Sequence, residues 1–151
     1  MIRSRIHSKQ FAVPLEAIDA NGHVGNLAYV AWMQEVAIEH SNAAGWPMER
    51  YRKIGAGWVV RSHFIEYLRP AFSGEMVSLH TWVPQFDQRA TPRRYLFVRD
   101  ADRQILVRAE TRWVFVDSTT GRRCPLPKDL VNAFEVVADD AEVRRTLGLS
   151  P

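Results

Sequence analysis

An unbroken apolar stretch near the start of the chain is followed by a mixed one. Residues 27–33 are all apolar, and residues 34–44 mix polar and apolar types. Asn26 suits the N-cap of a helix and Gly45 suits its C-terminal stop, so the pattern predicts one long helix between them. Because its first two turns are apolar almost all round, we expect this helix to be buried on most sides.

Segments rich in β-branched and aromatic residues predict strands. A first strand is expected at 11–15, stopped near Pro14, and residues 46–57 are expected to be irregular. Further strands are predicted at 58–68, 77–83, 95–98 and 105–116. A short helical stretch is expected from Asp129, and residues 138–149 are expected to form a last helix or a mobile tail.

The longest predicted strand, 105–116, alternates along its length. Arg108, Glu110 and Arg112 share one face. The other face is predicted to carry Ile105, Val107, Ala109, Thr111, Trp113 and Phe115. Both faces are apolar toward the strand end, and an open sheet edge of that kind invites pairing with a second copy. We therefore expect a homodimer or a larger homo-oligomer.

The order of the elements predicts the fold class. One long helix is followed by about four strands without crossover helices, which indicates an antiparallel sheet. The sheet needs an apolar body against its inner face, and the helix supplies it. We predict an α+β fold in which a curled antiparallel sheet wraps around one long central helix. No repeat or linker interrupts the chain, so residues 1–151 are expected to form a single domain, with a peripheral tail from about residue 135.

Composition narrows the class of protein. The 151 residues are 46% hydrophobic and 25% charged, which is ordinary for a globular domain. No apolar run approaches about 18 residues, so no membrane span is expected. The first residues lack the apolar block of a secretory signal, and the lone Cys124 excludes an internal disulfide. We expect a cytoplasmic protein.

The basic residues have an unusual make-up. The formal net charge is +3, and of the 20 Lys and Arg residues only Lys9, Lys53 and Lys128 are Lys. Arginine binds phosphate in a bidentate fork, which favours a polyanionic partner. Codon bias in a GC-rich genome explains the same excess more simply, so the charge by itself decides nothing.

Polar side chains gather in residues 19–26, directly before the predicted helix. Asp19, Asn21 and His23 are two apart and project from one side of an extended segment. A helix N-terminus favours negative charge, so a carboxylate, an imidazole and an oxyanion-binding helix end meet the needs of acyl transfer. Gly22 lets a substrate approach the backbone closely. The alternative is an ordinary polar loop, in which Asn26 caps the helix and Asp19 forms an Asx-turn.

The pattern Asp19-x-x-Gly22-x-Val24-x-x-x-x-Tyr29-x-x-Trp32 resembles the signature of hotdog-fold acyl-CoA thioesterases of the 4-hydroxybenzoyl-CoA thioesterase type. Further matches at 67–75 and 116–127 follow in the right order. The resemblance implies a hotdog fold and hydrolysis of an acyl-CoA or acyl-carrier-protein thioester. It also implies homodimers, often paired into homotetramers, with active sites at the subunit interface.

The loop resembles two kinds of thioesterase. In the 4-hydroxybenzoyl-CoA type the carboxylate at the position of Asp19 is catalytic, but the position of Asn26 usually holds Tyr or His. The string from Asp19 to Asn26 is also similar to the Asp-x-Asn-x-His-Val-Asn-Asn element of acyl-carrier-protein thioesterases, which use Asp, Asn and His together. The resemblance therefore implies that Asp19, Asn21 and His23 are catalytic. The residues expected to contact substrate there are Gly22, Asn26 and Tyr29.

The expected chemistry needs a small apparatus. A thioester releases a thiolate whose conjugate acid has a pKa near ~8.5, so little acid assistance is needed. Asp19 can attack the carbonyl or activate water, while helix N–H groups hold the oxyanion. The five histidines show no ligand spacing. We expect no metal and no cofactor other than the coenzyme A of the substrate.

The densest basic cluster is formed by Arg89, Arg93 and Arg94 around Pro92. In the enzymes that the chain resembles, the corresponding region reaches the nucleotide phosphates of coenzyme A. A solvated basic hairpin explains the cluster equally well.

Three other functions compete with thioester hydrolysis. A hotdog hydratase or dehydratase usually spaces its His and carboxylate differently. A non-catalytic acyl-thioester-binding module would bind substrate without turnover. A nucleic-acid binder would present Trp, Tyr and Arg on a sheet, but the Trp residues here mostly occupy apolar faces, so no nucleic acid is expected.

Overall fold

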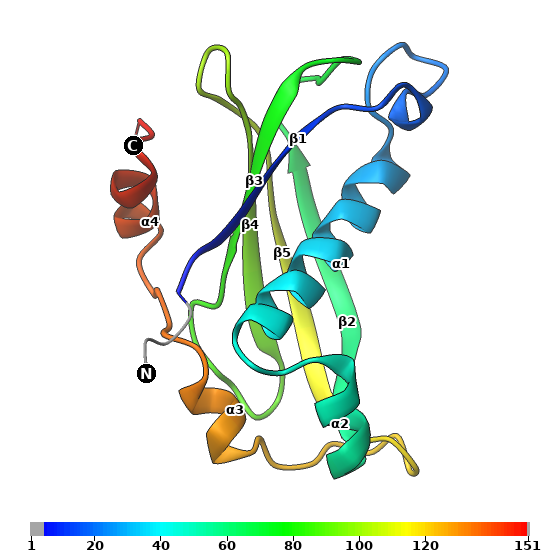
Figure 1. Cartoon of the computed structure of the whole chain (residues 1–151), viewed down its shortest axis with the longest axis vertical. Helices are drawn as coiled ribbons and strands as arrows, with labels where there is room; N and C mark the ends of the chain where they lie inside the picture. The colour runs from blue at the N-terminus through cyan, green and yellow to red at the C-terminus, as the bar shows by residue number, and fades with distance from the viewer. Residues whose placement is uncertain (1–4, 151) are drawn as a thin grey trace.

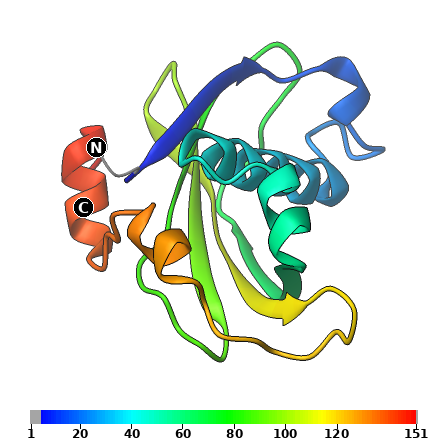
Figure 2. The same cartoon turned by 60° about the horizontal axis from the view of Figure 1, so that its bottom comes forward.

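The computed structural model describes residues 5–150. A five-stranded antiparallel sheet, in the order β1-β3-β4-β5-β2, curls around one long helix, α1 (Figures 1 and 2). The strands are β1 His7–Ala12, β2 Ala56–Tyr67, β3 Met76–Trp82, β4 Thr91–Arg99 and β5 Gln104–Asp117. The helices are η1 Leu15–Ala17, α1 Asn26–Ala43, α2 Met48–Ile54, α3 Lys128–Asn132 and α4 Asp140–Leu147. This arrangement confirms the predicted α+β hotdog fold.

Helix α1 begins and ends close to the predicted residues. Gly25, and not Asn26, is the N-cap, because the Gly25 carbonyl accepts the first helical bond from the Ala28 N–H and the Asn26 side chain makes no capping bond. At the other end Gly45 has a φ of +87°. The Gly45 N–H donates to the Asn42 carbonyl and the Trp46 N–H to the Ser41 carbonyl, which closes the helix end.

The prediction that α1 is buried on most sides is wrong for a single chain. One face packs on the sheet and carries the buried residues Tyr29, Met33, Val36, Ala37 and His40. The opposite face is open, and Leu27 in its first turn is 87% exposed. The reason is that the sheet wraps only part of the helix circumference (Figure 2). An apolar helix surface therefore remains without cover.

The inner layer of the core lies between α1 and the sheet. Tyr29 packs edge-on against Phe97 at 5.0 Å between ring centroids. A bulge in the pairing of β4 with β5 leaves Leu106 as the extra residue, since Val98 pairs with Ile105 and Phe97 with Val107. The extra residue moves Ile105 to the outer face, so the prediction that Ile105 shares a face with Val107 is wrong.

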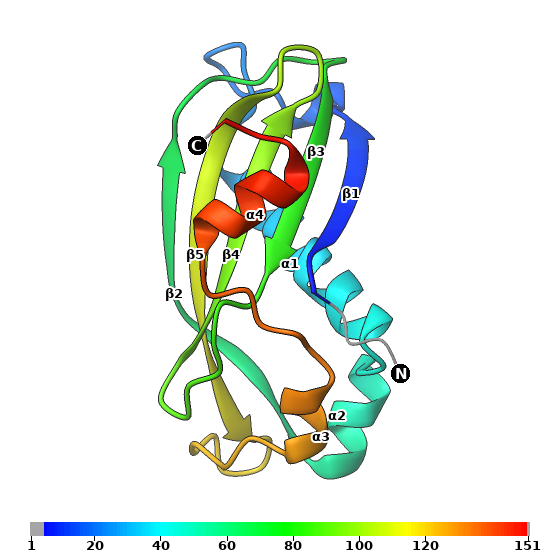
Figure 3. The same ribbon diagram turned by 90° about the vertical axis from the view of Figure 1, so that its left-hand side faces the viewer.

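The outer face of the sheet is also covered in part. Figure 3 shows α4 lying across β4 and β5 on that face. Val143 of α4 and Val137 before it are buried against Trp82, Leu96 and Val98. Asp139 is the N-cap of this helix, and its side chain accepts a bond from the Ala141 N–H.

Several predicted boundaries shift. The first strand ends at Ala12, earlier than predicted, because η1 follows Pro14. Residues 46–57, predicted to be irregular, contain α2, which starts after Pro47 and ends at Gly55 in the left-handed region. The strand predicted at 95–98 extends over 91–99.

The prediction that the longest strand lies at an open edge of the sheet is wrong. β5 lies inside the sheet, because β4 pairs along one side and β2 along the other. The free edges belong to β1 and to the long strand β2. Apolar side chains on β2, including Val59, Val60 and Phe64, are exposed. Over residues 5–150, no helix combines the length and apolar character that a membrane crossing requires.

Candidate active site

The loop between β1 and α1 is a closed and rigid turn. Ile18 and Val24 form a β-bridge, and the Asp19 N–H donates to the His23 carbonyl at 2.9 Å. Gly22 has a φ of +84°, a conformation that favours glycine, and its N–H closes the turn on the Asp19 carbonyl. The Val24 N–H donates to the Ala71 carbonyl and the Gly25 N–H to the Ala17 carbonyl, and these bonds hold the loop against the rest of the fold. The loop is therefore held in one position relative to α1.

The Asp19 carboxylate lies against the N-terminus of α1. A Cβ atom added at Gly25 would lie 3.1 Å from the Asp19 Cβ and 3.4 Å from its Oδ2. Oδ1 accepts a bond from the Asn21 N–H at 2.8 Å, which is the expected Asx-turn. The structural and the catalytic interpretations of Asp19 are therefore compatible, since one oxygen holds the turn and the exposed side chain faces the positive end of a helix.

His23 is half-buried beside the same turn. Its Nδ1 is 3.1 Å from the Val24 carbonyl oxygen, and an N–H donated there leaves Nε2 as the acceptor. A ring in that tautomer can take a proton from water or from a reacting group. Asn21 lies in the same turn as Asp19 and Asn26 is the first residue of α1, and both are exposed.

Tyr29 has a different environment. Its ring is buried in the core and packs edge-on against Trp32 and Phe97. Burial raises the pKa of Tyr29 to about 12. The structure thus places this ring behind the loop, in the layer that supports it.

The three arginines predicted to act together do not form one basic surface. Arg89 is exposed in the loop before β4, and its backbone N–H donates to the Asp87 Oδ1. Arg93 points to the inner face and is buried. Arg94 points to the outer face, where it pairs with Glu110 and Asp140. Neighbouring residues on a strand face opposite sides, which separates Arg93 from Arg94.

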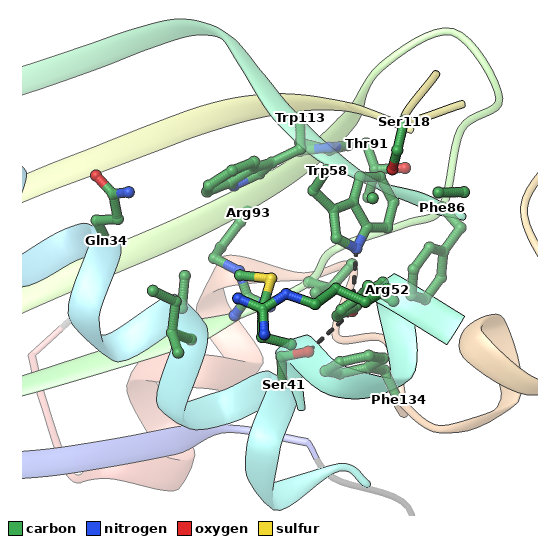
Figure 4. A pocket seen from close by; sticks show the side chains of 18 residues that line it. Gln34, Ser41, Arg52, Trp58, Phe86, Thr91, Arg93, Trp113, Ser118 and Phe134 are labelled. Carbon is green, nitrogen blue, oxygen red and sulfur yellow. Dashed lines mark hydrogen bonds between the residues drawn. The ribbon is translucent and has the colours of Figure 1, made fainter. Parts of the chain in front are cut away.

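A cavity of about 260 Å³ lies at the other end of α1 (Figure 4). Its walls come from the C-terminal half of α1, from α2 and from the ends of β2, β4 and β5. The lining is mainly apolar and includes Ala37, Ile38, Met48, Trp58, Val83, Phe86, Trp113 and Phe134. The sequence analysis missed this cavity because it missed α2. The flanking Pro47 and Gly55 were a signal that could have revealed that helix.

A buried hydrogen-bond network lines part of the cavity. The Tyr51 hydroxyl is 2.9 Å from the Ser41 Oγ and accepts a bond from the Trp58 Nε1–H at 3.2 Å (Figure 4). Burial raises the pKa of Tyr51, so the phenol stays neutral. The network joins α1, α2 and β2 and fixes the shape of the wall.

The loop and the cavity are separated within one chain. Figure 1 shows the β1–α1 loop at one end of the molecule and α2 with α3 at the other. From Asn26 to Gln34, where the cavity begins, is eight residues of helix, which is about 12 Å at 1.5 Å per residue. A single chain therefore does not bring Asp19 to its own cavity. Residues 5–150 contain no group of three or more His, Cys, Asp or Glu placed to hold a metal ion.

Solved structures share this fold. A 1,4-dihydroxy-2-naphthoyl-CoA thioesterase from Synechocystis superposes with a TM-score of 0.77 at 18% identity, over 89% of this chain and 96% of that one. A 12:0-ACP thioesterase from Umbellularia californica does so with a TM-score of 0.77 at 21% identity, over 91% of this chain and 54% of that one. These likenesses establish the class of the fold, the hotdog fold.

The sequence then identifies the family. The model of the Thioesterase-like superfamily matches residues 13–134, and the chain belongs to that superfamily. A palmitoyl-acyl carrier protein thioesterase from Gossypium hirsutum is 24% identical over 91% of this chain. An oleoyl-acyl carrier protein thioesterase from Arabidopsis thaliana is 25% identical over 69% of it. The chain spans 37% and 30% of the lengths of these two relatives.

Proposed function

We propose that this protein hydrolyses an acyl-CoA or acyl-carrier-protein thioester to a free acid and a thiol, with Asp19 as the reacting carboxylate. The observation that carries the proposal is the position of Asp19 against the N-terminus of α1 in a chain of the Thioesterase-like superfamily. A carboxylate and unpaired helix N–H groups at one point suit attack on a carbonyl and stabilisation of its oxyanion.

Two routes are open to Asp19. As a nucleophile, its oxygen bonds to the thioester carbon, the C–S bond breaks and the thiolate leaves; water then cleaves the mixed anhydride. As a general base, it takes a proton from a water molecule that attacks the same carbon. Both routes release acid and thiol without a redox step, and both use the helix N–H groups for the oxyanion. The exposed Asn21 side chain and the His23 ring hold water in either case.

The active unit in this proposal is a homodimer paired along β2. A two-fold axis through β2 pairs the strand with its own copy in antiparallel fashion and turns one chain end for end. The loop end of one protomer then lies beside the cavity end of its partner. The exposed side chains of Val59, Val60 and Phe64 on β2 and of Leu27 on α1 support this pairing. Each site then takes Asp19 from one chain and the acyl cavity from the other.

A panel of thioesters tests the proposal directly. The panel contains saturated acyl-CoAs of graded length, aromatic acyl-CoAs and matching acyl-carrier-protein thioesters, with thiol release followed by a colorimetric reagent. We expect at least one member to be hydrolysed with a kcat/KM of about 10⁴ M⁻¹s⁻¹ or more. Saturable binding without thiol release would instead indicate a binding module. Hydration of an enoyl-CoA would indicate a hydratase.

The His23→Ala variant tests the role of the imidazole. If His23 moves a proton in the transition state, the variant should lower kcat by about 10²-fold and raise KM much less. The control is His80→Ala, which removes an imidazole that contacts Ser8 on the neighbouring strand β1. A fully active His23→Ala enzyme would leave Asp19 working with the helix end alone.

A further inference from the structure

Arg93 is a buried cation without a buried anion. Only 7% of the residue is exposed, and its Nη1 donates to the Thr81 Oγ1 at 3.1 Å and to the His40 Nδ1 at 2.8 Å. In the part of the chain that the structure describes, the side-chain partners of Arg93 are His40 and Thr81, and no carboxylate pairs with it. A charge removed from water needs a partner of opposite sign, so this guanidinium lacks the group that would stabilise it.

The imidazole beside Arg93 does not supply that charge. Burial, with smaller contributions from Arg93 and His7, lowers the pKa of His40 to about 2. The ring is therefore neutral at physiological pH, and its Nδ1 accepts the bond from Arg93. Burial also lowers the pKa of Arg93 itself, the direction expected for a charge held in an apolar environment. A guanidinium nevertheless remains protonated in proteins.

The cavity wall supplies donors and cations and no acid. Arg93 and Arg52 both line it, and none of the lining residues is Asp or Glu. In Figure 4, Arg93 reaches into the cavity from β4 and Arg52 extends across it from α2. Trp113 lines the same wall with its indole ring, whose buried Nε1–H lies at the Tyr95 hydroxyl. The cavity wall therefore carries two cations and no carboxylate, which favours a negatively charged ligand.

We propose that the cavity binds an acyl group whose end remote from the thioester carries a carboxylate, and that this carboxylate pairs with Arg93. This inference rests on the proposed thioester hydrolysis, which makes the ligand an acyl group. It goes beyond that proposal by naming the class of acyl group. Arg52, which is exposed and lines the same cavity, adds positive charge. Apolar side chains enclose the remainder of the group.

The size of the cavity limits the acyl group. A cavity of about 150 Å³ is enough to hold benzene. The 260 Å³ found here accommodates one ring with a carboxylate, or an aliphatic chain of similar bulk. The best substrates are therefore short dicarboxylic monothioesters or carboxyaryl thioesters.

A matched pair of substrates tests this inference. We compare 4-carboxybenzoyl-CoA with 4-methylbenzoyl-CoA, which has the same ring and an uncharged end. Wild-type protein should prefer the carboxylate by at least about 10²-fold in kcat/KM, because only that end satisfies the buried donors. Arg93→Gln should abolish the preference, and Arg52→Gln, which removes the exposed cation of the wall, should reduce it by about 2- to 5-fold. Lys53→Gln, which removes an exposed cation from α2 outside the cavity wall, should retain it.

A binding measurement separates failure of this inference from failure of the proposed function. Calorimetry compares 4-methylbenzoate with its neutral counterpart 4-methylbenzamide on wild type, Arg93→Gln and Arg52→Gln. Binding of the anion alone, lost in Arg93→Gln, supports the cavity assignment even if no thioester is hydrolysed. Equal hydrolysis of the two CoA thioesters, or an unchanged preference in Arg93→Gln, overturns the assignment while the thioesterase proposal stands. If Arg93→Gln does not fold, the wild-type preference and the Arg52→Gln result decide the matter.

Discussion

Replacing Asp19 by Asn is expected to lower kcat for thioester hydrolysis by at least about 10²-fold, with the fold intact. Asparagine keeps the side-chain oxygen that accepts the Asn21 N–H, so the turn that positions the loop survives. What is lost is the negative charge that attacks the carbonyl or activates water. Steady-state kinetics on the best thioester, with thermal unfolding measured in parallel, checks the result.

The comparison with Asp19→Ala separates chemistry from structure. Alanine removes both the charge and the turn acceptor, so it should be as inactive as Asn and less stable by about 1 kcal/mol. Glu16→Gln, which neutralises another exposed carboxylate in the segment before the loop, is the control and should keep wild-type kcat. An active Asp19→Asn beside an inactive Asp19→Ala would mean that Asp19 only holds the loop.

Breaking the β2 edge is expected to abolish activity without unfolding the chain. The double variant Val59→Glu, Phe64→Glu places carboxylates on two exposed positions of β2, which are 48% and 63% exposed. In an antiparallel self-pairing these charges face one another and repel. Because the positions are exposed in one chain, the stability of the protomer should change by no more than about 1 kcal/mol in total.

Two measurements on the same sample check this prediction. Sedimentation should show a dimer or larger assembly for the wild type and a monomer for the double variant, and thiol release should fall by at least about 10²-fold. Val136→Glu, an exposed apolar position outside the sheet, should leave both unchanged. A fully active monomer would contradict both the dimer along β2 and a site shared between two chains.

Local pattern was enough for the elements that depend on neighbours in sequence. The Gly45 stop and the apolar run after Asn26 located α1, because helix ends are set by groups within one turn of them. Alternation correctly placed Val107, Ala109 and Thr111 on one face of β5, and all three are buried. The polar string from residue 19 identified the loop, because it is contiguous and precedes a helix end.

The sequence analysis assigned residues to the wrong face of the sheet where it misplaced the start of a strand or missed a bulge. Arg93 and Arg94 looked like one basic cluster because the strand was predicted to start at residue 95. Once β4 starts at Thr91, the two-residue period of a strand sends them to opposite faces. A single extra residue, Leu106, likewise moved Ile105 to the other side of the sheet.

The amino-acid sequence by itself determined the helix, the alternating strands, the α+β class and the loop that carries Asp19, since each follows from the chemistry of adjacent residues. Only the tertiary structure decided which strand forms the sheet edge, because strand order depends on contacts between distant segments. It also decided the cavity, whose wall joins α1, α2, β2 and Phe134. Only the tertiary structure shows that the charge of Arg93 is buried and unpaired. Burial depends on everything that surrounds a side chain and not on its place in the sequence.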